Sequence, residues 1–248
     1  MQGLQAGRGL TGERAVAARL ESLDWEGIER ALGAAGHATT GVLLDADGCA
    51  GLRALYGDDR RFRSRVDMAR FRFGEGEYKY FAEPLPPVVA TLRAHAYARL
   101  APIANQWAKA LGSGPGYPAT LAEFRRDCAA QGQTRPTPLL LCYTTGGYNC
   151  LHQDLYGAVA FPFQMTIVLS RPGVDFTGGE FLLVEQRPRA QSRGDVVALA
   201  QGEAVIFATR HRPAPGARGF FRTTLRHGVS RLRSGERLAL GIIFHDAE

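Results

Sequence analysis

The chain has 248 residues, of which 45% are hydrophobic and 22% are charged, a balance that excludes an intrinsically disordered protein. No apolar run approaches the roughly 18 residues that cross a bilayer. The N-terminus also has no basic segment followed by an apolar one, so we expect a cytoplasmic protein with no membrane partner. The net charge of +6 is carried by 28 arginines and two lysines. It would attract phosphate or acidic partners, although the arginine usage also fits a GC-rich genome.

The N-terminal half of the chain alternates predicted helices with short strands. Thr11, Asp24 and Asp45 each precede an apolar periodic segment and are suited to cap a helix. Between Arg60 and Phe81, arginines alternate with apolar residues, which is typical of strands. The expected elements, in chain order, are helices over 11–20 and from 24 to 33 or 36, a strand over 41–44, a helix from the 45–48 turn to about 56, two strands over 60–81 broken at 74–76, a helix from the prolines of 84–87 to about 111, and a helix over 119–130.

From Pro138 onward, short apolar runs recur between turn residues, as in an antiparallel sandwich or barrel. We therefore expect a mainly β protein with flanking helices and a single domain over 1–248. Residues 1–135 would form a helical and β support region, and residues 136–248 the catalytic core. The apolar runs cover 139–144, 163–170, 180–184, 195–199, 204–208, 219–226 and 237–244.

The cysteines carry no recognisable site. Cys49, Cys128, Cys142 and Cys150 include no C-x-x-C pair, which argues against zinc–thiolate binding, and a disulfide framework does not suit a reducing compartment. We expect buried small side chains or unpaired thiols.

His152, Asp154 and His227 carry a metal-binding pattern within the β region. Two histidines and one carboxylate form the facial triad of non-haem Fe(II) oxygenases, which leaves positions open for a bidentate 2-oxo acid and for O2. In an extended strand, residues i and i+2 point to the same side, so His152 and Asp154 can reach one ion. A His-x-Asp triplet by itself is weak, because chance gives one in roughly a quarter of chains of ordinary composition.

The residues around His227 make the pattern more specific. Over 138–246 the order and spacing of motifs resemble the prolyl-4-hydroxylase-like branch of the 2-oxoglutarate/Fe(II) dioxygenases. The resemblance implies a double-stranded β-helix, or jelly roll, as the core of the fold. The shared motifs are the distal His227 with Val229, Gly235-Glu236-Arg237 at the opening of the final strand, Gly178-Gly179-Glu180-Phe181, and the turn and strand over 202–207.

The resemblance also implies roles for individual residues. His152, Asp154 and His227 would bind Fe(II), and Arg237 would bind the distal carboxylate of 2-oxoglutarate, to which a guanidinium offers two parallel donors. With O2 as the other co-substrate, decarboxylation of 2-oxoglutarate to succinate would accompany hydroxylation of a C–H bond. Tyr143 and Val229 would be further co-substrate residues. From their positions along this chain, we add Thr166 on the co-substrate side and, on the substrate side, Tyr148, Asn149, Arg210 and Arg212.

The sequence leaves the substrate open. We place a protein side chain or small molecule first and oxidative dealkylation of damaged or methylated nucleic acid second. A non-catalytic metal-binding jelly-roll module and a metal-dependent hydrolase are further alternatives. The nucleic-acid hypothesis rests on three basic segments, which could equally be solvated faces, and on aromatic residues that could stack on bases. The segments are 60–72, 186–193 and 208–219, the last expected to be a loop near the site mouth, and the aromatic residues are Phe62, Phe71, Tyr78 and Phe220.

Overall fold

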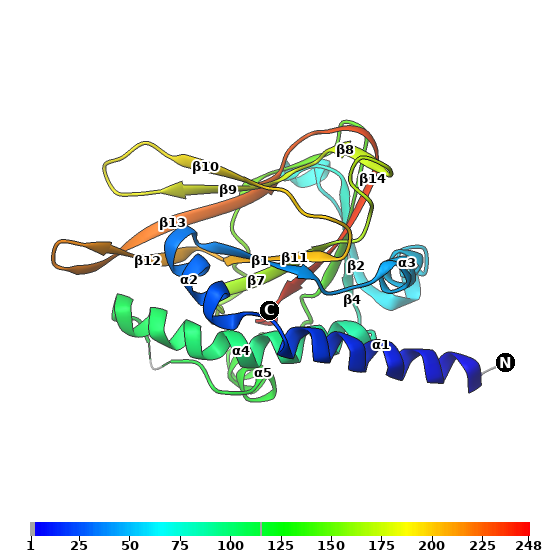
Figure 1. Cartoon of the computed structure of the whole chain (residues 1–248), viewed down its shortest axis with the longest axis horizontal. Helices are drawn as coiled ribbons and strands as arrows, with labels where there is room; N and C mark the ends of the chain where they lie inside the picture. Colours follow the sequence, from blue (N-terminus) through cyan, green and yellow to red (C-terminus); the bar gives the residue numbers. More distant parts are fainter. Residues whose placement is uncertain (1–2, 115) are drawn as a thin grey trace.

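Two antiparallel sheets face each other as a jelly roll in the computed structural model, which describes residues 3–114 and 116–248, with side chains from residue 12 onward. The expected fold class, mainly β with flanking helices, is confirmed. Helices α1 (Gly3–Glu21), α4 (Pro87–Leu111) and α5 (Leu121–Ala130) lie together on one side of the sheets, below them in Figure 1. No helix among the described residues is long and apolar enough to span a membrane.

The larger sheet has the strand order β1-β11-β7-β14-β5-β4-β2, with β8 paired to β14. Its central strands are β7, which is almost entirely buried, and β14, which is buried from Arg237 onward. The strands are β1 (His37–Val42), β2 (Phe62–Asp67), β4 (Glu77–Phe81), β5 (Leu139–Thr144), β7 (Phe163–Val168), β8 (Phe176–Gly178), β11 (Glu203–Ala208) and β14 (Leu232–Ile243).

The smaller sheet has the order β10-β9-β13-β6-β3, with β12 paired to β13. It lies opposite the larger sheet and carries two of the predicted metal ligands. Its strands are β3 (Gly74–Glu75), β6 (Tyr148–His152), β9 (Phe181–Gln186), β10 (Arg193–Val197), β12 (His211–Gly216) and β13 (Gly219–Val229).

The helix ends follow the local sequence. Asp24 and Asp45 accept hydrogen bonds from the backbone N–H groups of Gly27 and Gly48, both at 2.9 Å, and so cap α2 (Trp25–Ala35) and α3 (Ala46–Leu55) as predicted. Gly36 ends α2 in the left-handed conformation, with φ of 80°. Two short 3₁₀ helices, η1 (Asp59–Arg61) and η2 (Ala69–Phe71), flank β2.

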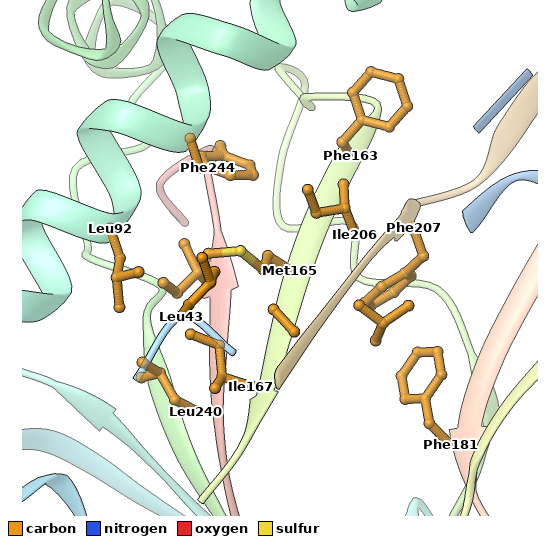
Figure 2. Close-up of a cluster of buried hydrophobic side chains, with 14 of the residues drawn as sticks. Leu43, Leu92, Phe163, Met165, Ile167, Phe181, Ile206, Phe207, Leu240 and Phe244 are labelled. Atoms are coloured by element: carbon orange, nitrogen blue, oxygen red, sulfur yellow. The ribbon is translucent and has the colours of Figure 1, made fainter. Parts of the chain in front are cut away.

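The period-2 alternation of β7 separates the core from a cavity between the sheets. Phe163, Met165 and Ile167 are fully buried, and Figure 2 shows them on the side of the sheet that faces α4. Gln164 and Thr166 point the other way and line the cavity. Strand β14 alternates in the same manner, and its small cavity-facing residues, Ala239 and Gly241, leave the space open.

A buried ion pair fastens the C-terminus to α4. The Arg93 guanidinium lies 2.7 Å from Asp246 Oδ1 and also donates to the carbonyl oxygens of Ile243 and Phe244. Arg125 on α5 donates to the other carboxylate oxygen at 2.8 Å. These contacts hold the end of β14 against the helical layer.

Three sequence expectations differ from the structure. Helix α1 begins at Gly3, so Thr11 lies inside the helix and does not cap it. The strand expected over 41–44 is β1, over 37–42, because it pairs in register with β11. The 208–219 insert is not a loop: it contains β12 and the turn that leads into β13, because β12 is an edge strand and tolerates Pro213 and Pro215 where no ladder hydrogen bond is needed. All four cysteines are free.

Candidate active site

The three predicted metal ligands converge on one point between the sheets. His152 ends β6 and lies opposite His227 of β13 in the strand register. Asp154 follows two residues after β6, and its carboxylate faces both rings. His152 Nε2 lies 3.5 Å from Asp154 Oδ1, and His227 Nε2 lies 3.2 Å from Asp154 Oδ2. Cis ligands lie about 3 Å apart when each is about 2.1 Å from an ion, so the cluster has the size of a metal site.

Hydrogen bonds orient two of these side chains. His152 Nδ1 lies 2.7 Å from the carbonyl oxygen of Cys150, to which only a protonated nitrogen can donate. The lone pair is thereby left on Nε2, which faces the cluster. The hydroxyl of Tyr156 donates to Asp154 Oδ1 at 2.6 Å. Both contacts are of the kind that fixes the direction of a metal ligand.

The protonation states of the cluster also suit a divalent cation. Burial would raise the pKa of Asp154, but its contacts with His152 and His227 outweigh burial and hold that pKa well below its usual range. Burial, followed by the charge of His152, lowers the pKa of His227. Burial would also lower the pKa of His152, but Asp154 outweighs it and raises that pKa. An ion would have one proton at most to displace.

A cavity of about 320 Å³ opens beside the cluster and contains Arg237. Arg237 is only 2% exposed, and burial lowers its pKa. Among the described residues no carboxylate pairs with it, and its Nε has no hydrogen-bond partner. A buried, unpaired guanidinium is costly unless an anion joins it. The site therefore fits a carboxylate ligand in the same cavity as a metal ion.

Tyr143 shares this part of the cavity. It lies opposite Arg237 in the β5–β14 register, with the guanidinium carbon 5.7 Å from the ring centre. Its hydroxyl accepts a hydrogen bond of 3.3 Å from Asn149 Nδ2, and burial raises its pKa. The hydroxyl is therefore a neutral donor at the same end of the cavity as Arg237.

The structure brings three of the six other predicted residues to this cavity. Val229, Thr166 and Asn149 line it. Tyr148 is not among its lining residues, and the Arg231 guanidinium carbon lies 4.7 Å from the centre of its ring. Arg210 lines a different pocket, near the end of α4.

Arg212 is not a substrate-side residue. It is 1% exposed, and its guanidinium donates to both oxygens of the buried Glu185 carboxylate, at 3.0 and 2.9 Å. It also donates to the carbonyl oxygen of Gly33 at 2.8 Å. Arg212 thus ties α2 to the smaller sheet.

The three basic segments carry less unpaired positive charge than their sequence indicates, because several of their arginines form ion pairs. Arg187 and Arg193 lie against Glu185, which also holds Arg212. Within 60–72, Arg60 and Arg65 pair with acidic residues. Of the aromatic residues suggested for base stacking, Phe62 packs on Phe81 with ring centres 4.9 Å apart and Phe220 lies on the β12–β13 hairpin, whereas Tyr78 lines the cavity.

Sequence reasoning missed two parts of the site. Tyr156, two residues after Asp154, could have been found by the same i, i+2 argument that linked His152 to Asp154. Phe73 and Arg72 line the cavity from the segment between β2 and β4, because β3 pairs with β6 and the N–H of Cys150 donates to the carbonyl oxygen of Phe73 at 2.8 Å. No local signal in the sequence marks this pairing.

Comparison with known protein families gives a match over residues 76–247 to Oxygenase-NA, described as an oxygenase catalysing oxidative methylation of damaged DNA. The chain belongs to this family. An uncharacterized protein of Mycobacterium tuberculosis, found in two strains, is 52% identical over 167 residues, which are 67% of this chain and 72% of that protein.

Solved structures share the fold of this Oxygenase-NA protein at low identity. A Pseudomonas putida prolyl-4-hydroxylase aligns with a TM-score of 0.55 at 14% identity, over 90% of this chain and 99% of that one. A 2-oxoglutarate/Fe(II) oxygenase from Burkholderia pseudomallei aligns with a TM-score of 0.53 at 17% identity, over 91% and 94%. A Trichoplax adhaerens prolyl hydroxylase, solved with a hypoxia-inducible-factor peptide, aligns with 0.54 at 14%, over 96% and 91%.

Family, fold and site agree on the class of enzyme. The family model describes an oxygenase, the jelly roll is that of 2-oxoglutarate/Fe(II) oxygenases, and the His–Asp–His cluster is present. The prediction of a 2-oxoglutarate-dependent Fe(II) dioxygenase is confirmed, and with it the prediction of Fe(II), 2-oxoglutarate and O2 as cofactor and co-substrates.

Proposed function

We propose that this dioxygenase oxidises a damaged base in nucleic acid, using His152, Asp154 and His227 as its iron ligands and Arg237 to bind 2-oxoglutarate. The observation that carries the cofactor assignment is the buried Arg237 guanidinium without an acidic partner, in the same cavity as the His–Asp–His cluster. The whole chain would act as one catalytic unit, in the cytoplasm, where nucleic acid is accessible and thiols stay reduced.

Different residues of the cavity would hold the iron, orient the co-substrate and exclude water. Bound iron would supply the activation of O2 that oxidises a C–H bond. His152 and Asp154, held by the Cys150 carbonyl and the Tyr156 hydroxyl, keep the ligand geometry fixed. Arg237 and Tyr143 orient the co-substrate from the opposite end, and the apolar walls over Leu139, Leu141 and Ile243 exclude water.

The mouth of the cavity supports a nucleic-acid substrate. Phe71 and Phe73 are 57% and 47% exposed, and their rings stack on each other with centres 5.6 Å apart. The exposed Arg72 lies between them in sequence and lines the cavity together with Phe73. Exposed aromatic rings beside a cation are the combination that binds unstacked bases and their phosphates.

These features reverse the order of substrates that the sequence favoured. A protein or small-molecule target was placed first, but the family description names damaged DNA, and the rim carries aromatic and cationic groups. Hydroxylation of an N-methyl group gives an N-hydroxymethyl group, which leaves as formaldehyde and restores the N–H. Oxygenation of a methylated base would therefore remove the methyl group.

The cofactor half of the proposal is tested by anaerobic titration of the apo protein with Fe(II) and then 2-oxoglutarate. We expect a visible metal-to-ligand charge-transfer band that is lost in His152→Ala, and succinate after O2 is admitted. Absence of both the band and 2-oxoglutarate affinity would instead support a binding module or a hydrolase.

The substrate half is tested with single-stranded and duplex oligonucleotides that carry one N-methylated base, against the same sequences unmethylated. We expect formaldehyde and succinate in equal amounts with methylated strands only. The matched variants are Phe73→Ala, which should raise KM, and Phe220→Ala, another exposed ring, on the β12–β13 hairpin, which should leave KM unchanged. Stimulation of succinate release by peptides or small metabolites, but by no oligonucleotide, would contradict the proposal.

A further inference from the structure

A second pocket lies at the other end of the loop that carries Asp154. Gln153 and Asp154 line the catalytic cavity, and the next residue, Leu155, lines this second pocket of about 270 Å³. The pocket is formed where the C-terminal end of α4 meets the β12–β13 hairpin, two segments that Figure 1 shows at the same end of the molecule. Its volume is close to the lower end of the roughly 300–1,000 Å³ of small-molecule sites.

The floor of the pocket is aromatic and firmly held. Trp107 of α4 and Tyr117 lie on it together with Phe161. The Tyr117 hydroxyl donates to the carbonyl oxygen of Ala160 at 3.2 Å, and the Thr209 hydroxyl donates to that of Phe161 at 3.1 Å. The N–H of Tyr117 also donates to Asn105 Oδ1 of α4 at 2.6 Å. These bonds connect the floor to α4 on one side and to the segment before β12 on the other, so the pocket is preformed.

The rim of the pocket is basic and contains no acid. Arg210, His211 and Arg222 line it, and none of its lining residues is Asp or Glu. Both arginines are exposed, and neither makes an ion pair within the part of the chain that the structure describes. Burial lowers the pKa of His211, and the charges of Arg210 and Arg222 lower it further.

This rim differs from the other arginine clusters of the same sheet. Arg187, Arg193 and Arg212 each form an ion pair with Glu185, and Arg193 also pairs with Asp195. Two arginines that line one pocket with no acidic residue beside them favour the binding of an anion there. An aromatic floor below such an anion site suits a phosphate that carries a planar base.

We propose that this pocket is a binding site for the phosphate group of a nucleotide, separate from the catalytic cavity. Arg222 lies five residues before His227 on β13, so the two are about 17 Å apart along the strand, and the odd spacing places their side chains on opposite faces. A ligand that spans both sites passes over Gln153 and Leu155 at the sheet edge. The phosphate comes either from a nucleic-acid strand that also enters the cavity or from a free nucleotide.

The test compares Arg210→Gln/Arg222→Gln with Arg14→Gln/Arg218→Gln. Both double variants remove two positive charges from exposed arginines, and only the first alters the pocket. The probes are deoxyadenosine monophosphate, followed by NMR shifts of the Trp107 indole, and a fluorescent single-stranded oligonucleotide, followed by anisotropy at several salt concentrations. Unchanged 2-oxoglutarate binding and thermal midpoints show that the variants are folded.

We expect the pocket variant to bind at least tenfold more weakly than the control variant. If the strand is the source, the oligonucleotide affinity falls and its salt slope decreases by about 0.7–0.9 for each lost phosphate contact. If a free nucleotide is the source, only the mononucleotide responds, which leaves the site assigned and removes support from the nucleic-acid substrate. If the wild type binds the strand and the two variants bind equally well, the proposed phosphate site is wrong, and the proposed function is unaffected. Binding of neither probe also overturns it.

Discussion

Replacement of Arg237 by methionine should affect ligand binding and protein stability in opposite directions. The guanidinium is 2% exposed and has no acidic partner among the described residues, so in the absence of ligand it is a desolvated, uncompensated charge. Methionine has a similar length and no charge. We therefore expect the variant to lose 2-oxoglutarate affinity and, at the same time, to gain stability when no ligand is present.

The structure sets the size of both effects. Loss of one partner of a buried charge pair costs about 3–5 kcal/mol, which corresponds to a roughly hundredfold to few-thousandfold rise in the Kd of 2-oxoglutarate at about 1.4 kcal/mol per tenfold. Removal of the unpaired charge should stabilise the apo protein by about 1 kcal/mol or more, or about 2–4 °C in Tm for a chain of this size.

The assay is calorimetric titration of 2-oxoglutarate into the Mn(II)-loaded protein, with thermal melts of the apo protein in parallel. Arg233→Met, on the same strand but exposed, is the control and should change neither quantity appreciably. An Arg237→Met protein that melts lower than the wild type while its 2-oxoglutarate Kd stays within threefold would refute the reasoning, because Arg237 would then be a structural residue.

Three further predictions follow from single contacts. Arg93→Met should lower the free energy of unfolding by about 3–5 kcal/mol in urea titrations, since the buried Asp246 carboxylate keeps only Arg125 as a partner and the carbonyl oxygens of Ile243 and Phe244 lose their donor; a loss under about 1 kcal/mol would contradict this. Tyr156→Phe removes the donor to Asp154 and should weaken Fe(II) binding about 10- to 100-fold, with unchanged affinity as the contrary result. Burial lowers the pKa of His245 to about 4. The unfolded state therefore binds more protons between pH 6.5 and 4, and stability should fall on acidification through that window by up to about 1.4 kcal/mol per pH unit. His245→Asn should flatten that dependence in urea titrations, and an identical slope would show that another group titrates.

Most of the strands and helices could be predicted from the sequence, because apolar runs and helix caps are local patterns. Strands β7 and β14 were predicted from apolar runs in the sequence, and Asp24 and Asp45 cap the helices that they precede. Strand β12 was not predicted, because Pro213 and Pro215 locally indicate a loop. Only the pairing of that edge with β13 shows that the prolines are compatible with a strand.

The sequence by itself determined the chemistry of this protein. The spacing of His152 and Asp154, the distal His227 and the glycine-led Arg237 are local patterns, and they were sufficient for the class of enzyme. Which charged side chains are buried, and which form ion pairs, was decided only by the tertiary structure. Arg212 and Arg210 are two residues apart and look alike in the sequence, yet Glu185, 27 residues before Arg212, neutralises one of them, and the other stands in a pocket without an acid. A charge becomes structural or functional through its neighbours in space, and distant segments supply those neighbours.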